Sequence, residues 1–158
     1  MTAKLISASN KPDGLIAPIT LDIRPHILVV DDDQKIRELN AKALTRSGFL
    51  VDAVEDGAIA WDAIQQKQYD LLVTDNDMPN LTGVGLLQKL HAARMILPVI
   101  LSTGIVPQEE LMRHPWLKIG AVLLKPYTFN ELMDKVTNVL CPSCGGGEPM
   151  ISPINPSR

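Results

Sequence analysis

Acidic, hydroxyl and ammonium side chains follow four short apolar runs in this sequence. Asp31 and Asp32 come after the first run, and Asp75 comes after the second. Thr103 and Lys125 come after the third and the fourth. Short apolar runs without alternation are typical of parallel strands that are covered on both faces. Because ligands of open α/β sheets bind beyond the carboxyl ends of the strands, we expect these five side chains to meet at one sheet edge.

Such a meeting would suit phosphoryl transfer. Two carboxylates about 4–5 Å apart repel each other by roughly 3–4 kcal/mol at an effective dielectric near 20, so three acids require a cation among them. Oxygen ligands without His or Cys favour a hard ion, and Mg²⁺ accepts few protein ligands. One carboxylate, Asp75, could then attack a phosphoryl group. Thr103 could donate a hydrogen bond to one phosphoryl oxygen, and Lys125 could neutralise another.

Each of these residues also has a purely structural interpretation. The acidic run 31–33 could only cap a helix, Thr103 could be a turn hydroxyl, and Lys125 could be a surface lysine. Their joint occurrence at the ends of four apolar runs favours the chemical interpretation. Asp77, two residues after Asp75, is favoured as a turn acid over a catalytic base.

Five expected strands alternate with five expected helices, which implies βαβ crossovers and a doubly wound parallel α/β sheet with helices on both faces. Asp33 is expected to cap the first helix, and Gly48 to end it in the left-handed conformation. The apolar stripe of that helix consists of Ile36, Leu39, Ala43 and Leu44. The strands are expected at 26–30, 50–54, 70–74, 98–102 and 120–124, and the helices at about 34–47, 57–67, 83–94, 107–114 and 128–140.

The composition bounds the class of protein. A chain of 158 residues with 46% hydrophobic and 21% charged residues fits one globular domain. The net charge of −3 offers no basic surface for nucleic acid. No apolar run approaches the roughly 18–20 residues that span a bilayer, and prolines interrupt any signal-peptide core near the start. We therefore expect a cytoplasmic protein with no nucleic-acid or membrane partner.

The ends of the chain differ from its middle in composition. We expect a flexible leader at 1–24, one domain at 25–140, and a flexible Gly- and Pro-rich tail at 141–158. Cys141 and Cys144 resemble half a zinc site, but zinc needs four ligands and no second pair exists. A redox pair would normally precede a helix, and this pair follows one. We therefore expect no metal or redox site in the tail.

Residues 26–140 resemble the receiver domain of two-component response regulators, in particular the single-domain receivers of the chemotaxis type. The motifs that carry the resemblance are highly specific when taken together. They are Val30-Asp31-Asp32, Thr74-Asp75 followed by Met78-Pro79 and Gly83, Pro98 to Gly104 with Thr103, and Lys125-Pro126-Tyr127. The resemblance implies a flavodoxin-like (βα)5 receiver fold with strand order 2-1-3-4-5, which the residues alone do not supply.

The resemblance also implies a role for each acid. Asp75 would accept a phosphoryl group from a phosphohistidine of a sensor histidine kinase or of a phosphotransfer protein. Asp31, Asp32, Asp75 and the backbone carbonyl of Asp77 would hold Mg²⁺. The protein would catalyse only its own phosphoryl transfer and dephosphorylation, and it would not be an enzyme acting on other substrates.

Further implications concern the groups around the phosphoryl site. Thr103 and Lys125 would contact the phosphoryl oxygens, and Lys125-Pro126 would be a cis peptide. A downstream protein, or a second copy of the chain, would read the phosphorylated form through residues 107–140. That surface lies beside Thr103 and Lys125 in the expected fold.

Three positions depart from the usual receiver pattern. An aromatic residue usually stands three positions before the lysine, but here that residue is Val122. The coupled movement of a threonine and an aromatic ring is therefore not expected. Asp77 and Ile105 occupy the positions that tune the lifetime of the phosphoryl group in this family.

Other functional classes explain the motifs less well. A haloacid-dehalogenase-like phosphatase would share the pair Asp75 and Asp77, but its further acids lie downstream, whereas here they lie upstream. A flavodoxin-like cofactor site would need hydroxyl and glycine donors after the first strand, where the acids 31–33 would repel a phosphate. The main alternative is a receiver-like scaffold that binds a partner without being phosphorylated.

Overall fold

The sheet and its helices match the expected architecture. The computed structural model describes residues 23–143. One parallel sheet has the strand order β2-β1-β3-β4-β5, which confirms the doubly wound flavodoxin-like fold. The strands are β1 (His26–Val30), β2 (Leu50–Val54), β3 (Leu71–Asp75), β4 (Val99–Thr103) and β5 (Ala121–Leu124). The helices are α2 (Gln34–Arg46), α3 (Gly57–Gln66), α4 (Gly83–Ala92), α5 (Gln108–Arg113) and α6 (Phe129–Leu140).

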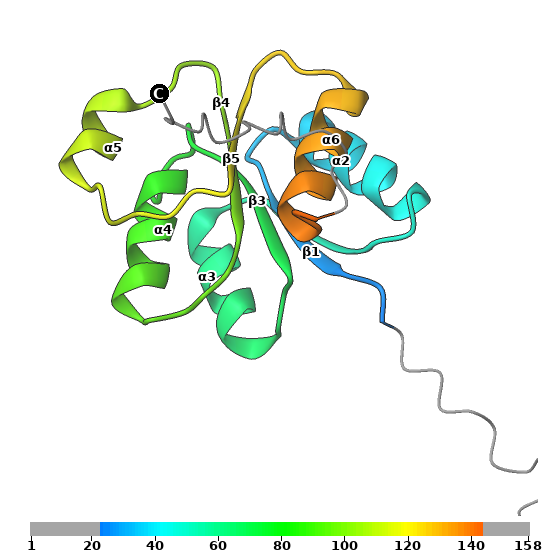
Figure 1. The fold of residues 1–158 in the computed structure, drawn as a ribbon, viewed down its shortest axis with the longest axis horizontal. Coiled ribbons are helices and arrows are strands. Elements are labelled where there is room, and N and C mark those ends of the chain that lie inside the picture. The colour runs from blue at the N-terminus through cyan, green and yellow to red at the C-terminus, as the bar shows by residue number, and fades with distance from the viewer. Residues whose placement is uncertain (1–22, 144–158) are drawn as a thin grey trace, which may run out of the picture.

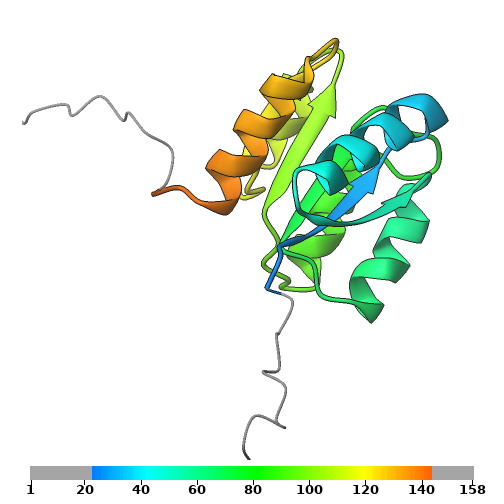
Figure 2. The ribbon, with the colours of Figure 1, turned by 90° about the vertical axis from the view of Figure 1, so that its right-hand side faces the viewer.

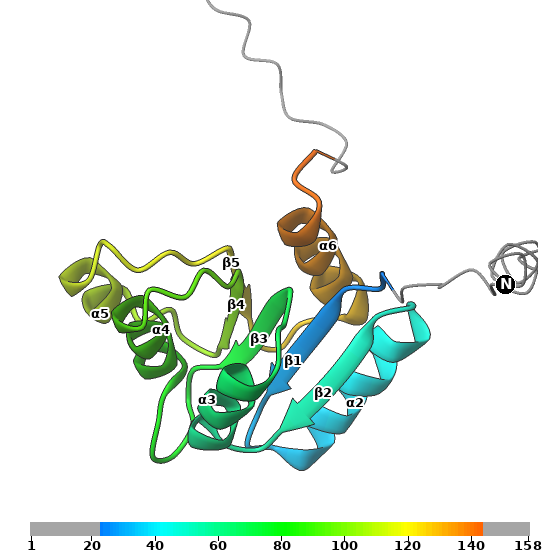
Figure 3. The same ribbon diagram turned by 90° about the horizontal axis from the view of Figure 1, so that it is seen from below.

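The helices cover both faces of the sheet (Figures 1 and 3). On one face, α3 and α4 pack on alternate residues of the central strands, such as Leu28 and Leu72. On the other face, α2 and α6 pack on the intervening residues, such as Val29 and Val73. Figure 2 shows α2 and α6 side by side across this second face. Burial on both faces explains why the central strands are apolar without alternation.

Strands β3 and β4 each begin and end one residue later than expected. The ladder between β3 and β4 pairs Asp75 with Ser102, and the next backbone amide, Asn76, donates a hydrogen bond to the Ser102 carbonyl. As a result, Asp75 and Thr103 are the last residues of their strands and not the first residues of loops. Both side chains are therefore held by the sheet.

The first helix begins and ends as expected, but its apolar stripe lies only in part on its buried face. The Asp33 side chain accepts hydrogen bonds from the backbone at the start of α2, and Gly48 has a φ of +96° just after its end. The buried residues of α2 are Asn40 and Leu44, whereas Leu39 is 69% exposed. The helix is rotated so that positions 40 and 44, one turn apart, face the sheet. Leu39 therefore lies on an outer surface.

The other expectations concern helix α5, helices that could cross a membrane, and the two ends of the chain. Helix α5 is shorter than the expected 107–114, and none of its residues is buried. None of the described helices is long and apolar enough to cross a membrane. Cys141 caps the end of α6 and is disulfide-bonded, so the expectation of an unremarkable tail is wrong for this cysteine. Cys144 and most of the expected leader and tail lie outside the described residues.

Candidate functional site

The carboxyl ends of β1 and β3 bring three acids together. Asp31, Asp32 and Asp75 each offer a carboxylate oxygen, and these oxygens all lie within 4.8 Å of one another. Asp31 and Asp75 are buried, at 2% and 3% exposure, while Asp32 is exposed. Two of the three acids are thus buried, and the third lies at the surface. The sequence predicted that these residues would meet, and they do.

Lys125 reaches this cluster from the end of β5. Its Nζ lies 3.3 Å from Asp31 Oδ2 and 3.2 Å from Asp75 Oδ1. Burial lowers the pKa of Lys125, but the two carboxylates outweigh burial and the net pKa is raised. Burial raises the pKa of Asp31, against the opposing effects of a hydrogen bond from the Asp33 amide and of the Lys125 charge. One ammonium thus offsets part of the charge of two buried acids.

The chemistry of this donor set suits a hard divalent cation. Asp75 Oδ1 is buried and faces the Lys125 ammonium at 3.2 Å, and this one ammonium also serves Asp31. Two buried carboxylates that share one ammonium keep an excess of negative charge, which a bound cation would offset. An all-carboxylate set with one exposed member leaves room for the water ligands that Mg²⁺ retains. The residues therefore fit Mg²⁺, and Asp75 keeps an oxygen that is available for other chemistry.

Thr103 lies at the end of β4 and is fully buried. Its Oγ1 lies 2.7 Å from the Ile105 carbonyl oxygen and 3.2 Å from Asp77 Oδ2, and it also accepts a hydrogen bond from the Ile105 amide. The Asp77 carboxylate is thus directed at Thr103 and is not part of the three-acid cluster. The sequence placed Asp77 in a turn, but it did not reveal this contact.

The turn after Asp75 is fixed to α4 by two features. The Asn76 side chain, which is 7% exposed, accepts a hydrogen bond from the Val84 amide. A Cβ at Gly83 would lie 2.7 Å from the Asp75 carbonyl oxygen, so only glycine permits this close approach. Gly83 belongs to the motif that carries the resemblance to receiver domains, whereas no role was predicted for Asn76. An Asx residue at the start of a turn was the available signal.

Arg37 is a second residue that the sequence did not single out. Its guanidinium donates a 2.7 Å hydrogen bond to the Asp31 carbonyl oxygen and lies 3.8 Å from Glu55 Oε2. It therefore supports the backbone that carries Asp31 and Asp32. No local motif marks this role, because the contact depends on how α2 leaves β1.

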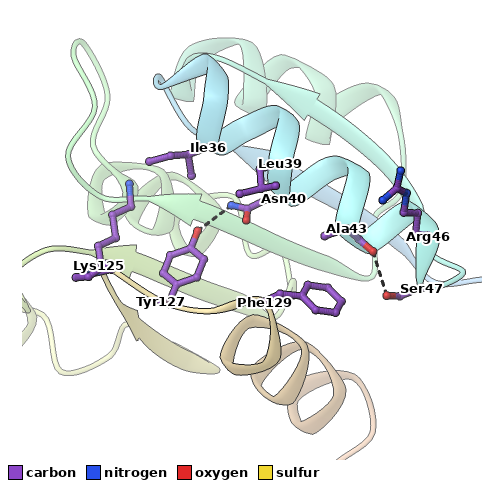
Figure 4. Close-up of a pocket in the computed structure, with 10 residues that line it drawn as sticks. Ile36, Leu39, Asn40, Ala43, Arg46, Ser47, Lys125, Tyr127 and Phe129 are labelled. Carbon is purple, nitrogen blue, oxygen red and sulfur yellow. Dashed lines mark hydrogen bonds between the residues drawn. The ribbon is translucent and has the colours of Figure 1, made fainter.

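Lys125 also lines a pocket on the α2 side of the sheet edge (Figure 4). The pocket has a volume of about 760 Å³ and lies between α2 and the segment that joins β5 to α6. Asn40 donates a 2.8 Å hydrogen bond to the Tyr127 hydroxyl inside it. Leu39 and Phe129, which are 69% and 48% exposed, also line it.

The end of β5 carries two features that the sequence predicted, a cis peptide at Lys125-Pro126 and a non-aromatic residue at position 122. The Lys125-Pro126 peptide is cis, as the resemblance implied. Val122 lies on β5 opposite Leu101 of β4 and is half-buried, so no aromatic ring stands beside Thr103 from this position.

Comparisons with known proteins agree with this geometry. The sequence model of the response regulator receiver domain matches residues 27–137. The chain is 32% identical over 114 residues to the probable transcriptional regulatory protein SilR of Salmonella typhimurium, covering 72% of this chain and 50% of SilR. It is 29% identical over 116 residues to the chemotaxis protein CheY of Pseudomonas aeruginosa, covering 72% of this chain and 94% of CheY.

Solved structures give the same result. The response regulator protein TrrA of Thermotoga maritima, solved in complex with Mg²⁺ and BeF, superposes with a TM-score of 0.64 at 29% identity. That match covers 73% of this chain and 99% of TrrA. The chain spans about half the length of the curated relatives SilR and CusR.

Proposed function

Since this chain belongs to the response regulator receiver domain family, we propose that it is a phosphoacceptor of a two-component phosphorelay and that Asp75 is the acceptor. One observation supports this assignment above the others. Asp75 is buried beside two further acids, and its Oδ1 faces one ammonium, that of Lys125 at 3.2 Å, which Asp31 shares. A merely structural buried aspartate would be expected to have its charge balanced, whereas here three clustered acids face a single lysine.

In the proposed reaction, a carboxylate oxygen of Asp75 attacks the phosphorus of a phosphohistidine. The new P–O bond makes an acyl phosphate, the P–N bond breaks, and the departing imidazole nitrogen takes up a proton. Asp31, Asp32, Asp75 and the backbone carbonyl of Asp77 would hold Mg²⁺, which neutralises charge on the phosphoryl oxygens when it is bound.

The chain's own groups complete the site. The Lys125 ammonium, already drawn to the two buried acids, would move onto a phosphoryl oxygen as charge accumulates there. The Thr103 hydroxyl would donate a hydrogen bond to another phosphoryl oxygen. Arg37 would keep the metal-binding turn in place through its bond to the Asp31 carbonyl.

The donor must bring its phosphohistidine to the exposed side of this sheet edge. The pocket between α2 and the segment after β5 opens beside Lys125, and it exposes Leu39 and Phe129 (Figure 4). An apolar surface next to a charged site suits a protein donor, a histidine kinase or a phosphotransfer protein. We propose that the donor contacts this surface.

The output would use another part of the molecule. We propose that a downstream protein or a second copy of the chain reads the surface formed by residues 107–140. Helix α5 within it has no buried residue, and Met112 is 80% exposed. An element with few buried contacts is easy to displace.

Mass spectrometry after incubation with acetyl phosphate or phosphoramidate and Mg²⁺ tests the proposal. We expect one added phosphoryl group that hydroxylamine removes, and none in Asp75→Asn. Equal modification of Asp75→Asn would refute the assignment of the acceptor. Absence of modification in the unaltered protein would favour the alternative of a receiver-like scaffold that is not phosphorylated.

A further inference from the structure

The hydroxyl of Ser102 is buried without a hydrogen-bond partner. The residue is 1% exposed, and its Oγ has no partner within the part of the chain that the structure describes. Buried hydroxyls in proteins are normally hydrogen-bonded, because an unpaired one is unfavourable in the folded state. Ser102 is the residue before Thr103 in β4, where an apolar side chain could fill the same space without this penalty. The hydroxyl therefore requires an explanation.

Ser102 lies beside Asp75 in the sheet. The ladder between β3 and β4 pairs the two residues, and neighbouring strands lie about 4.8 Å apart. Both side chains point to the face covered by α2 and α6, since Val73 and Ile100, two residues earlier in each strand, belong to the core of that face. Because the hydroxyl turns with a single torsion angle, Ser102 can direct it toward the Asp75 side chain.

In the protein without a phosphoryl group, Lys125 serves Asp75 instead. Its ammonium lies 3.2 Å from Asp75 Oδ1, and charged hydrogen bonds are about twice as strong as neutral ones. Under the proposed function, phosphorylation converts the Asp75 carboxylate into an acyl phosphate and draws the ammonium to a phosphoryl oxygen. The Asp75 oxygen outside the new P–O bond then becomes a buried carbonyl oxygen that has lost its donor.

We propose that Ser102 is a positioning residue, which donates a hydrogen bond to this carbonyl oxygen only when Asp75 is phosphorylated. The inference rests on the proposed function, because it concerns the same acceptor. Strand β3 lies between β1 and β4, so the acids that would hold the metal approach Asp75 from one side and Ser102 from the other. A carbonyl oxygen has two lone pairs and can accept from Ser102 while it faces a cation. A contact made only in the phosphorylated state favours that state.

Affinity for beryllofluoride, a stable mimic of the phosphoryl group, is the first measurement. At saturating Mg²⁺, Ser102→Ala should bind the mimic about 3- to 10-fold more weakly than the unaltered protein, because one hydrogen bond of the complex is lost. Unchanged affinity would refute the inference. Tighter binding would also refute it, since the hydroxyl would then already serve the free carboxylate.

A matched pair of variants separates the hydroxyl from packing. Ser102→Thr and Ser102→Val have side chains of nearly the same shape, and only the first keeps a hydroxyl. Ser102→Thr should bind beryllofluoride more tightly than Ser102→Val by a factor similar to that between the unaltered protein and Ser102→Ala. Equal affinities in this pair would mean that Ser102 acts through its size, and the inference would fail.

Stability without Mg²⁺ or the mimic gives a readout of the opposite sign. A hydroxyl without a partner does not stabilise the folded state, so Ser102→Val should be at least as resistant to urea as Ser102→Thr. A lower urea midpoint for Ser102→Val would mean that the hydroxyl has a partner in the unphosphorylated protein, which would overturn the inference. A residue that only supports the fold would lower the midpoint and leave the affinity for beryllofluoride unchanged.

The structure of the beryllofluoride complex measures the contact directly. Ser102 Oγ should lie within about 3.2 Å of an Asp75 oxygen, and a clearly longer separation would refute the inference. Failure of the unaltered protein to bind beryllofluoride would instead refute the proposed function. Binding that no Ser102 substitution alters would leave the proposed function in place and remove only the role of Ser102.

Discussion

At the scale of single residues, the site is defined by an excess of buried negative charge. Asp31 and Asp75 are both buried, and Lys125 lies within 3.3 Å of each. The lysine and a divalent cation therefore compete for the same two carboxylates. This competition sets how stable the protein is with and without metal.

Replacing Lys125 by Met keeps the length of the side chain but removes its charge. We expect Lys125→Met to lower the free energy of unfolding by about 1–3 kcal/mol in the absence of Mg²⁺, because two buried carboxylates lose their counter-charge. Mg²⁺ should restore much of this loss, since the cation takes the place of the ammonium. Urea unfolding without Mg²⁺ and with Mg²⁺ at roughly 10 mM, a concentration suited to a weak site, measures both effects. An equal loss under both conditions would contradict the competition.

The metal itself gives a second prediction at this scale. Asp31→Asn with Asp32→Asn removes two of the three clustered carboxylates, so Mg²⁺ affinity should fall by at least about tenfold. Isothermal titration calorimetry measures it, and Asp62→Asn is the control for a loss of charge elsewhere. Unchanged affinity in the double variant would show that the ion binds in another place.

The sequence predicted which residues meet at the site, but not every contact between them. Asp31, Asp75, Thr103 and Lys125 could be placed together because each ends a buried strand of a parallel sheet, and the sheet brings strand ends to one edge. The contact between Asp77 and Thr103 could not be predicted. It joins the turn after β3 to the last residue of β4, 26 residues further along the chain, and it depends on the direction of side chains that follow no periodic pattern.

At the scale of elements, a polar cluster centred on Asp52 holds the outermost strand, β2, in place. One carboxylate oxygen of Asp52 accepts hydrogen bonds from Tyr69 at 2.7 Å and from Lys67 at 2.9 Å, and it lies 3.2 Å from His26 Nε2. The cluster thus ties β1 and β2 to the segment between α3 and β3. Burial raises the pKa of Asp52, but these partners outweigh burial and the net pKa is lowered from 3.8.

The cluster leads to a prediction for pH dependence. A carboxyl group with a lowered pKa in the folded state stabilises the protein above its unfolded pKa, and this contribution is lost as the pH falls through the folded pKa. Asp52→Asn should therefore lower the free energy of unfolding by about 1 kcal/mol at pH 7, as expected for lost hydrogen bonds to a charged group that is partly exposed. The difference should shrink as the pH falls below about 3.8. Urea unfolding at pH 7, 4 and 3 measures it, and a difference that is constant with pH would contradict the assignment.

Elements also show where periodicity misleads. The stripe of Ile36, Leu39, Ala43 and Leu44 predicted a helix correctly, and the bounds of α2 agree with it. The orientation of the helix was not contained in the stripe, because Asn40 takes a buried position through its bond to Tyr127, 87 residues away. A buried polar pair between distant elements overrides the local apolar pattern, and it leaves Leu39 exposed beside the pocket.

At the scale of the whole molecule, the helices on one face of the sheet are packed unequally. The helices α3 and α4 bury several residues each, whereas α5, on the same face, buries none. Ile105, Met112 and Trp116 are all exposed along the segment that contains α5. This segment begins next to Thr103 and ends at β5, so it connects the site to the proposed output surface.

A beryllofluoride complex tests whether this segment carries the signal. The new charge should draw Thr103 and Lys125 toward Asp75, and the segment 104–118 should move with Thr103 because few buried contacts hold it in place. Val122 has no aromatic ring to change its rotamer, so its amide should respond less. We expect the amide shifts in NMR spectra to be larger in 104–118 than at Val122. Shifts confined to 75–83, with 104–140 unaffected, would mean that the output surface lies elsewhere on the molecule.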